Sequence, residues 1–380
     1  MNTKVSLVRT TDHANLFDGI RQCIDLLGYD KIKVAKKILL KPNCLQDKKE
    51  AATTPEVIHE TINVIKEIKE GQEYQLFIGD SPGLLAKKSR KIFENLGIMD
   101  VIEESGINYV EFDGGKPPIQ VQIPEGIRLT ETTIAPIIEE VDLIINLPRL
   151  KTHGLTIYTG CIKNYWGIQP GGIKAKNHLK GTSTESFSTV ITDLYSYLAN
   201  KPQLCIMDAL EGMEGRGGPS SGPLRTLNLI IGGFDPVAVD TVAIAVIGYD
   251  ALKEVPHVRM CAERNLGVGD LNNIEILGSP LEDVKLIKPF RLPGKGIGWA
   301  SGLFGPIIYR YTKKIPRLKR KKCIKCGNCA KICPGDAITM NPYPSFNRKK
   351  CVNCLCCVET CPNDALRVGI AGFGGLLGIS

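Results

Sequence analysis

KKILLKPN, residues 36–43, is followed after a short segment by TPEVIHETINVIKEI, residues 54–68. The first is a brief apolar run bounded by charged and turn-forming residues, which is typical of a buried β-strand. The second repeats apolar residues at helical spacing, with Thr54 at the N-cap position and Pro55 as the first helical residue. Together they predict one strand-then-helix unit of an α/β sheet.

The same alternation extends through the first 280 residues. Further strands are predicted at residues 4–9, 74–83, 142–148, 203–210 and 227–233, and further helices at 15–28, 187–200 and 235–248. Strands joined by crossover helices form largely parallel sheets, so we expect a three-layer α/β domain. PPIQVQI and IRLTETTI, residues 117–123 and 127–134, predict an antiparallel excursion from it.

The composition is that of a folded globular chain. Of the 380 residues, 43% are hydrophobic and 23% are charged, which is close to average usage. The first ten residues do not resemble a secretory signal, and the apolar runs are shorter than the ~20 residues that a spanning helix needs. We therefore expect a cytoplasmic protein with no transmembrane segment. In the reducing cytoplasm, clustered cysteines bind metal more often than they form disulfides.

Nine of the fourteen cysteines lie in the last sixty residues, in two near copies of one pattern. CIKCGNCAKICP, residues 323–334, and CVNCLCCVETCP, residues 351–362, both have the spacing of bacterial two-cluster ferredoxins, in which the fourth cysteine ligates the other cluster. One [4Fe-4S] cluster is expected on Cys323, Cys326, Cys329 and Cys361. The second is expected on Cys351, Cys354, Cys357 and Cys333. Zinc also accepts four cysteines, but it does not demand this repeat with a following proline.

These patterns predict four segments along the chain. An α/β domain of unknown function covers residues 1–280, and a linker rich in Gly, Pro and basic residues covers 281–319. A small α+β domain of the bacterial ferredoxin type follows at 320–368, and an apolar tail at 369–380. Because a two-cluster module carries electrons but has no substrate pocket, any chemistry on a substrate must lie in the large domain or in a partner.

The net charge of +8 is concentrated before the first cysteine run. KKIPRLKRKK, residues 313–322, contains seven basic residues and no acid. Cations here could favour the reduced, more negative form of a cluster, or dock an acidic redox partner of ferredoxin or flavodoxin type, or bind a membrane surface. There is no aromatic-interleaved nucleic-acid motif, so no nucleic-acid partner is expected.

Polar residues follow the predicted strands of the large domain. Ligands of open α/β sheets bind at the carboxyl ends of the strands, so these side chains should converge there. The candidates for substrate binding are Lys41, Asn43, Asp80, Lys151, Asn164 and Asp208. The candidates for catalysis are His153, Lys163 and His178, which lie with Lys151 and Asn164 in a stretch without regular periodicity.

Each of these residues also has a purely structural interpretation, as a cap or as a hydrogen-bonded surface side chain. No G-x-G-x-x-G follows a strand and no P-loop is present, so the sequence does not support classical dinucleotide or nucleoside triphosphate binding.

The motifs and their order resemble the domain-of-unknown-function 362 family of iron–sulfur proteins. KPN, GDSPG, LPRLKTHGLTIYTGCIKNYWG, DALEGMEGRGGPSSG and DPVAVDTVA carry this resemblance, together with the double cysteine run. It implies an α/β domain fused to a ferredoxin module, common in anaerobic metabolism. More loosely, IKNYWGIQPGGIKAKNH is similar to the lysine-then-histidine segment of lactate-racemase-like proteins, from which the surrounding motifs depart.

The leading hypothesis is an iron–sulfur redox protein that passes low-potential electrons through two [4Fe-4S] clusters to an anionic substrate or cofactor. Lys41, Lys151 and Lys163 would anchor the anion, and His153 or His178, near an ordinary pKa, would supply a proton. Such a protein could be a ferredoxin-dependent oxidoreductase. The alternatives are an electron carrier whose large domain only docks protein partners, and a non-catalytic cofactor-binding or maturation factor.

Overall fold

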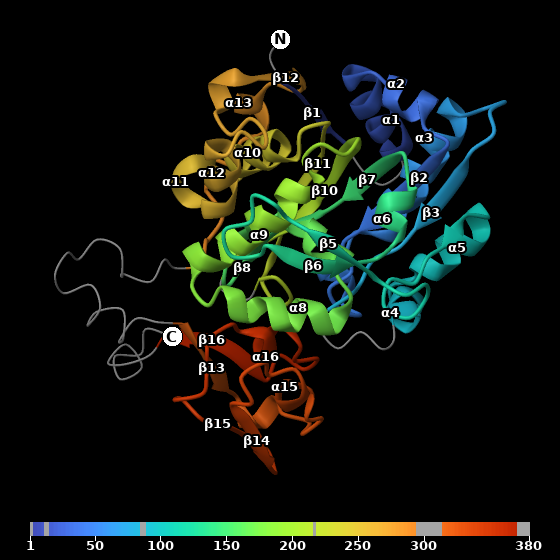
Figure 1. The fold of residues 1–380 in the computed structure, drawn as a ribbon. Coiled ribbons are helices and arrows are strands. Elements are labelled where there is room, and N and C mark those ends of the chain that lie inside the picture. The colour runs from blue at the N-terminus through green and yellow to red at the C-terminus, as the bar shows by residue number, and fades with distance from the viewer. Residues whose placement is uncertain (1–2, 11–14, 84–88, 216–217, 294–313, 371–380) are drawn as a thin grey trace.

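A large α/β domain and a small cysteine-rich module make up the fold seen in the computed structural model, which describes residues 3–10, 15–83, 89–215, 218–293 and 314–370. Figure 1 shows the module packed beneath one end of the large domain, against α8 (Gly171–Asn177). None of the helices in the described ranges is both long and apolar enough to cross a membrane.

The central sheet has the strand order β12-β1-β11-β10-β7-β2-β3-β4. In chain order these strands are β1 (Thr3–Arg9), β2 (Lys37–Pro42), β3 (Gln75–Ile78), β4 (Asn108–Tyr109), β7 (Leu143–Leu147), β10 (Gln203–Met213), β11 (Leu224–Gly233) and β12 (Ile274–Gly278). Only β11 runs antiparallel to its neighbours along this path. β8 (Arg149–His153) lies beside this path: it pairs in parallel with β10 and antiparallel with β9 (Ile157–Thr159). The expected largely parallel sheet is confirmed.

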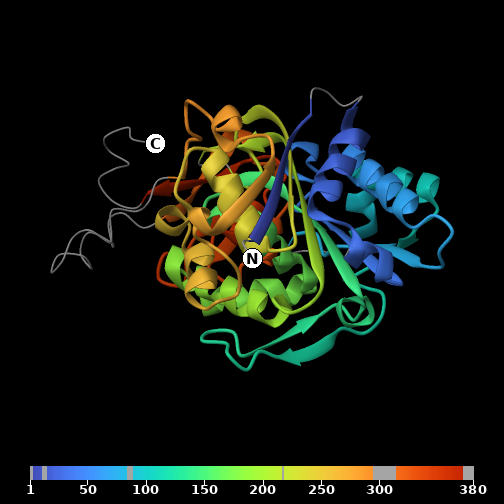
Figure 2. The ribbon, with the colours of Figure 1, turned by 90° about the horizontal axis from the view of Figure 1, so that it is seen from above.

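Helices cover both faces of this sheet, as Figure 2 shows from above. Alternate residues of the strands point to opposite sides: Leu39 and Ile144 belong to one buried core, and Ile38 and Ile145 to the other. The helices of one side are α1 (Leu16–Leu27), α2 (Asp30–Val34), α3 (Pro55–Ile68), α4 (Ser89–Leu96) and α5 (Ile98–Ser105). On the other side lie α9 (Thr184–Leu198), α10 (Pro236–Val246), α11 (Ala251–Glu254), α12 (Pro256–Glu263) and α13 (Leu281–Val284). The three layers are therefore present.

The antiparallel excursion is also present. β5 (Ile119–Gln122) and β6 (Glu131–Ile134) form a separate two-stranded antiparallel sheet, followed by α6 (Ile137–Glu140). Its apolar side chains Val121 and Ile134 are buried in the core of the large domain. This hairpin therefore covers the core rather than extending the central sheet.

The small module has the expected α+β composition. β13 (Lys314–Leu318) pairs antiparallel with β16 (Leu366–Ile370), and β14 (Ile338–Asn341) pairs with β15 (Tyr343–Phe346). The cysteine runs form two short helices, α15 (Asn328–Lys331) and α16 (Cys356–Glu359).

The structure differs from the predicted linker at both ends. Val284 and Phe290 are buried in the core of the large domain, so the domain continues past residue 280. β13 lies before residue 320 but belongs to the module, because it pairs with β16 at the far end of the module sequence. A local sequence pattern does not reveal such a pairing. Residues 294–313 of the predicted linker and 371–380 of the predicted tail lie outside the described residues.

Candidate functional site

The carboxyl ends of β2 and β3 bring two predicted site residues together. Lys41 is the penultimate residue of β2 and has no exposed surface, and its Nζ lies 2.7 Å from Oδ1 of Asp80, which follows β3. The other carboxylate oxygen of Asp80 accepts from the backbone N–H of Cys44 at 3.0 Å. A buried ion pair with these extra bonds satisfies both charges, so Lys41 is compensated and contributes little free positive charge to a ligand.

Asn43, Lys151 and Asn164 form a continuous polar network. The Nζ of Lys151 donates to Asn43 Oδ1 at 2.5 Å and to the backbone carbonyl of Ala51. The Nδ2 of Asn43 donates to Asn164 Oδ1 at 2.9 Å, and Asn164 Nδ2 donates to Asn146 Oδ1 at 2.7 Å. Each amide is therefore fixed in orientation by its partners, which holds the network rigid.

Lys163 has no comparable partner. It lies on α7 (Cys161–Asn164), whose first N–H groups donate to the carboxylate of Asp240. Among the residues that the structure describes, the Lys163 ammonium makes no hydrogen bond or ion pair, and its side chain lines two neighbouring pockets. This cation is therefore available to a ligand.

Asp208 is placed differently from the other predicted binding residues. Both of its carboxylate oxygens accept from Arg149 Nη1, at 2.7 and 2.6 Å, and one also accepts from the backbone N–H of Thr54. Because these bonds neutralise it in a fully buried position, Asp208 orients Arg149 rather than facing a pocket. Arg149 and Lys151 both line the second of the two pockets next to Lys163.

His153 faces the small module. Its Nδ1 accepts the backbone N–H groups of Leu155 and Thr156, at 3.0 and 3.2 Å, so a neutral ring carries its proton on Nε2. Nε2 lies 3.2 Å from Oε1 of Glu359, at the end of α16. The contact joins the two domains through a buried histidine and a buried carboxylate.

His178 and Lys174 form the opposite wall. His178 Nδ1 donates to the carbonyl of Lys174 at 2.7 Å, and its ring stacks on Phe187 with centroids 4.5 Å apart. Lys174 on α8 donates to the backbone carbonyl and the hydroxyl of Ser81, the latter at 2.8 Å. The neutral tautomer of His178 therefore has its proton fixed on Nδ1.

We call the pocket between these walls the interdomain pocket. It holds about 430 Å³ of space, including its open mouth. It is lined by Asn43, Cys44, Leu45, Asp80, Ser81, Gly83, Lys163, Asn164, Trp166, Gly167, Lys174, His178 and Glu359. Its walls come from the ends of β2 and β3, from α7 and α8, and from α16 of the module.

Burial shifts the protonation of this region strongly. Desolvation, with Lys163 and Arg149 nearby, lowers the pKa of Lys151 to about 7, and desolvation lowers that of Lys174 to about 8. Burial would raise the pKa of Glu359, but His153, Lys163 and His178 together lower it to about 2. The region therefore holds an ionised carboxylate surrounded by several cations.

The histidines do not have the ordinary pKa that the sequence suggested. Desolvation and the charge of Lys163 lower the pKa of His153 to about 4, and desolvation also lowers that of His178. Both rings are therefore neutral at pH 7, because the buried positions disfavour the imidazolium form. An isolated histidine pattern in a sequence does not reveal this burial.

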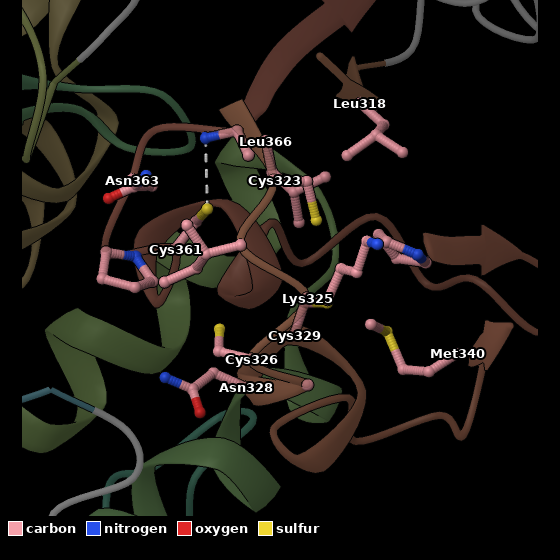
Figure 3. Close-up of a pocket in the computed structure, with 15 residues that line it drawn as sticks. Leu318, Cys323, Lys325, Cys326, Asn328, Cys329, Met340, Cys361, Asn363 and Leu366 are labelled. Atoms are coloured by element: carbon pink, nitrogen blue, oxygen red, sulfur yellow. Dashed lines mark hydrogen bonds between the residues drawn. The ribbon is translucent and has the colours of Figure 1, made fainter. Parts of the chain in front are cut away.

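Four cysteines of the module surround a first pocket, shown in Figure 3. It is lined by Cys323, Cys326, Cys329 and Cys361, the set predicted for one cluster, with neighbours that include Ile324, Lys325 and Met340. Its space is about 350 Å³. The backbone N–H of Ala365 donates to Cys361 Sγ at 3.2 Å. We call it the outer pocket.

The remaining four predicted ligands surround a second pocket of about 320 Å³. It is lined by Cys333, Cys351, Cys354 and Cys357, together with apolar residues such as Ala337, Val352 and Leu355. Here the backbone N–H of Ala337 donates to Cys333 Sγ at 3.2 Å. Thiolate sulfur with N–H donors in an apolar setting suits an iron–sulfur cluster, so the residues present fit that group. We call it the inner pocket.

The inner pocket adjoins the large domain. Cys354 packs with Ala175 of α8, as does Cys356, the one cysteine of the two runs that is not a predicted cluster ligand. Leu355 lies next to Gly154. Around this contact, Gln46 donates to the backbone carbonyl of Glu359, and Lys48 pairs with Asp364 at 2.6 Å.

Sequence reasoning missed two residues of the site. Arg149 comes two residues after the end of β7, as the first residue of β8, and obeys the same strand-end rule that selected Lys151. Glu359 lies inside the second cysteine run, and its only distinguishing feature in the sequence is that it is one of three acidic residues in the module. Its role depends on how α16 packs against the large domain.

Comparison with known families and proteins follows the division into two domains. The model of the "Domain of unknown function (DUF362)" matches residues 38–245, and that of the "4Fe-4S dicluster domain" matches residues 322–365. The "Thylakoid-associated protein sll1697" of Synechocystis sp. is 29% identical over 276 residues, covering 70% of this chain and 81% of the relative.

Two solved structures share weaker similarity. The lactate racemase apoprotein from Thermoanaerobacterium thermosaccharolyticum has a TM-score of 0.42 at 12% identity, over 62% of this chain and 54% of that chain. A Thermotoga maritima protein has a TM-score of 0.38 at 14% identity, over 59% of this chain and 56% of that chain. This chain thus spans little more than half the length of either protein.

The family model for the large domain covers more than half of the chain, and the dicluster model covers both cysteine runs. The dicluster match supports iron–sulfur cluster binding by the module. The chain belongs to the DUF362 family and carries a 4Fe-4S dicluster domain near its carboxyl end.

Proposed function

We propose that this protein is an iron–sulfur redox protein whose large domain binds a small anionic substrate or cofactor in the interdomain pocket and exchanges electrons with it. The observation that carries the proposal is the composition of that pocket. Lys163 of the large domain and Glu359 of the module line the same space, and Glu359 is two residues from both Cys357 and Cys361. A ligand held there lies directly beside the electron-carrying module.

The cysteines would hold two clusters. Cys323, Cys326, Cys329 and Cys361 would ligate one in the outer pocket. Cys333, Cys351, Cys354 and Cys357 would ligate the other in the inner pocket. A bound [4Fe-4S] cluster supplies one-electron transfer at low potential. The thiol positions and the N–H donors to Cys333 and Cys361 support this assignment.

The residues of the large domain would bind and orient the anion. Lys163 provides a positive charge that no hydrogen bond or ion pair within the described residues neutralises, with Glu359 as the nearby acid, while Asn43 and Asn164 form a fixed polar wall beside it. Asp80 lines the pocket and is held by Lys41 in a buried ion pair, and Asp208 acts only through Arg149. The pocket therefore favours a small ligand with at least one carboxylate or phosphate group.

A proton at neutral pH would come from a lysine rather than from a histidine. Lys151 lines the neighbouring pocket, which shares Asn43, Lys163 and Asn164 with the interdomain pocket. With a pKa of about 7 it can give up a proton near that pH, whereas His153 and His178 are already neutral. His153 would instead position Glu359, because its Nε2 proton faces that carboxylate. His178 would form part of the pocket wall next to Lys174.

The proposal can be tested on protein purified without oxygen. Native mass spectrometry should detect a small ligand retained beyond the mass of two clusters. In ligand-free protein, calorimetric titration with malonate and with inorganic phosphate should detect binding, and Lys163→Met should weaken it about tenfold or more.

Lys176→Met is the matched control, since it removes the same charge from an exposed position on α8. It should leave anion binding within about twofold of the parent. If no ligand is retained and no anion binds, or if both variants behave alike, the protein is a carrier whose large domain only docks partners.

A further inference from the structure

The outer and inner pockets differ in their access to solvent. In the outer pocket Cys326 is exposed, as are its neighbours Lys325 and Ile324, the latter at 59% of its maximal surface. In the inner pocket every lining residue is buried or half-buried, and Cys354 and Cys357 are each 7% exposed. Electron exchange between proteins requires the two redox centres to approach each other closely. Because the outer pocket is the more exposed of the two, a partner protein can approach it more closely than the inner pocket.

The charge of the protein is concentrated on the same module. Residues 314–370 contain twelve Lys and Arg residues and three Asp and Glu residues, whereas the rest of the chain is almost balanced, with 36 basic and 37 acidic residues. Of the three acids, Glu359 is buried and Asp364 is paired with Lys48. The exposed surface of the module is therefore strongly positive.

Several of these cations are held at the rim of the outer pocket. Arg320 and Lys325 both lie over the ring of Tyr343, at 5.6 and 5.1 Å from its centroid. The carbonyl of Lys322 accepts from Asn363 Nδ2, which ties the segment 320–322 to a residue that lines the pocket. The rim is therefore a preorganised cationic surface around one exposed apolar side chain, Ile324.

We propose that this rim, formed by Arg320, Lys321, Lys322, Ile324 and Lys325, is the docking surface for an acidic one-electron carrier protein. The apolar centre and charged rim match the anatomy of transient protein interfaces, and complementary charge speeds encounter. In each exchange the carrier loses one electron and the module gains it, or the reverse, so no proton or leaving group is required.

The docking surface sets an order for the two pockets. This order of electron transfer rests on the proposed function. The cluster in the outer pocket would exchange electrons with the carrier, and the cluster in the inner pocket would exchange them with the ligand. The inner pocket has the shorter route to that ligand, because its Cys354 packs with Ala175 of α8 and its Leu355 lies next to Gly154 of the large domain.

An anionic membrane is the other partner that cations could attract. Membrane-surface binding by a protein segment needs a sizeable apolar face beside the basic one. Ile324 is the one large apolar residue of the described module that is well exposed. The rim therefore fits an acidic protein better than a lipid surface.

The test uses the cluster-loaded protein and an acidic flavodoxin as the probe. Binding of oxidised flavodoxin, measured by calorimetry, involves no turnover, and reduction of the module by reduced flavodoxin is followed by stopped-flow absorption. The double variant Lys322→Glu/Lys325→Glu should weaken binding and slow reduction at low salt by about tenfold or more, and the difference should shrink at high salt.

The control is Lys349→Glu/Lys350→Glu, which makes the same charge change at exposed positions next to Cys351 of the inner pocket. It should alter both quantities by less than about threefold. Equal effects of the two variants would overturn the proposal, because net charge alone would then explain them. Loss of binding to phosphatidylglycerol vesicles in the first variant, with flavodoxin reduction unchanged, would assign the rim to a membrane instead.

Neither readout requires a ligand in the interdomain pocket. A failure of this docking proposal is therefore distinguishable from a failure of the proposed function.

Discussion

The outer and inner pockets arise from two near copies of one cysteine pattern, but their surroundings are different. The outer pocket opens to solvent beside a cationic rim, whereas the inner pocket is closed by the large domain through α8 and Gly154. The spacing of the cysteines determines which ligands can meet, and the packing of the module determines what each pocket can reach. Two equivalent motifs can therefore have different roles in one molecule.

The largest expected effect comes from removing one predicted ligand in each pocket. Cys354→Ala and Cys326→Ala should each lower the iron content from about eight to about four atoms per chain. Only Cys354→Ala should also increase hydrogen exchange in α8, because Cys354 packs with Ala175 there. Iron analysis and exchange mass spectrometry provide the measurements. An unchanged iron content in either variant would contradict the ligand assignment.

A second comparison separates the centre of the domain contact from its edge. Glu359→Gln removes a buried carboxylate that faces His153 and leaves Lys163 without its nearby negative charge, so we expect a loss of about 3 kcal/mol and a clear fall in the thermal unfolding midpoint. Asp364→Asn breaks only the half-buried pair with Lys48, at a cost of about 0.5 kcal/mol. Similar midpoints for the two variants would mean that Glu359 is not buried at the contact.

The apolar residues of the two pockets offer a third comparison. Leu355 is 3% exposed and lies next to Gly154, so Leu355→Ala should destabilise the module by about 2 kcal/mol. Ile324→Ala changes a well-exposed side chain and should cost less than about 0.5 kcal/mol. Chemical unfolding followed by loss of cluster absorption measures both. If Ile324→Ala proves the more damaging, the assignment of outer and inner pockets is reversed.

The smallest expected effect is a pH dependence of anion binding in the interdomain pocket and in the neighbouring pocket that Lys151 lines. The charged form of Lys151 attracts an anion, so malonate binding should weaken as the pH rises through about 7, with a further decrease near 8 from Lys174. Desolvation by burial is the main cause of the lowered pKa of Lys151; Lys163 and Arg149 lower it further, and Cys44 and Asp80 oppose them.

Calorimetry across this pH range provides the measurement. Lys151→Met should remove the step near 7, and Lys176→Met should retain it. A step that persists in Lys151→Met would assign it to another group. Flavodoxin binding at the outer rim should show no such step, because Lys151 and Lys174 do not belong to that surface.

Much of the fold was predictable because each element carries its own pattern. Strands such as β2 and β7 are buried on both faces and are therefore continuous apolar runs, and Pro55 marks the start of α3. β13 was missed because KIPRL, with its two cations and a proline, does not resemble a strand, and its partner lies at the other end of the module.

The site was only partly predictable. The strand-end rule placed Lys41, Asn43, Asp80 and Lys151 in one region, and the structure brings them together. It could not distinguish Asp208, which serves Arg149, from residues that face a pocket, since that depends on side-chain pairing. Glu359 was beyond the reach of sequence reasoning, because a contact between two domains leaves no local pattern.

Glu359 also affects how this family can be compared across genomes. The family match ends at residue 245, yet one wall of the interdomain pocket is supplied by residue 359, which lies in the domain matched by the separate dicluster model. A homologue without the fused module would have this cavity open on one side, with Lys163 more accessible to water. Ligand preference in such proteins should therefore be inferred from the whole gene architecture and not from the shared domain alone.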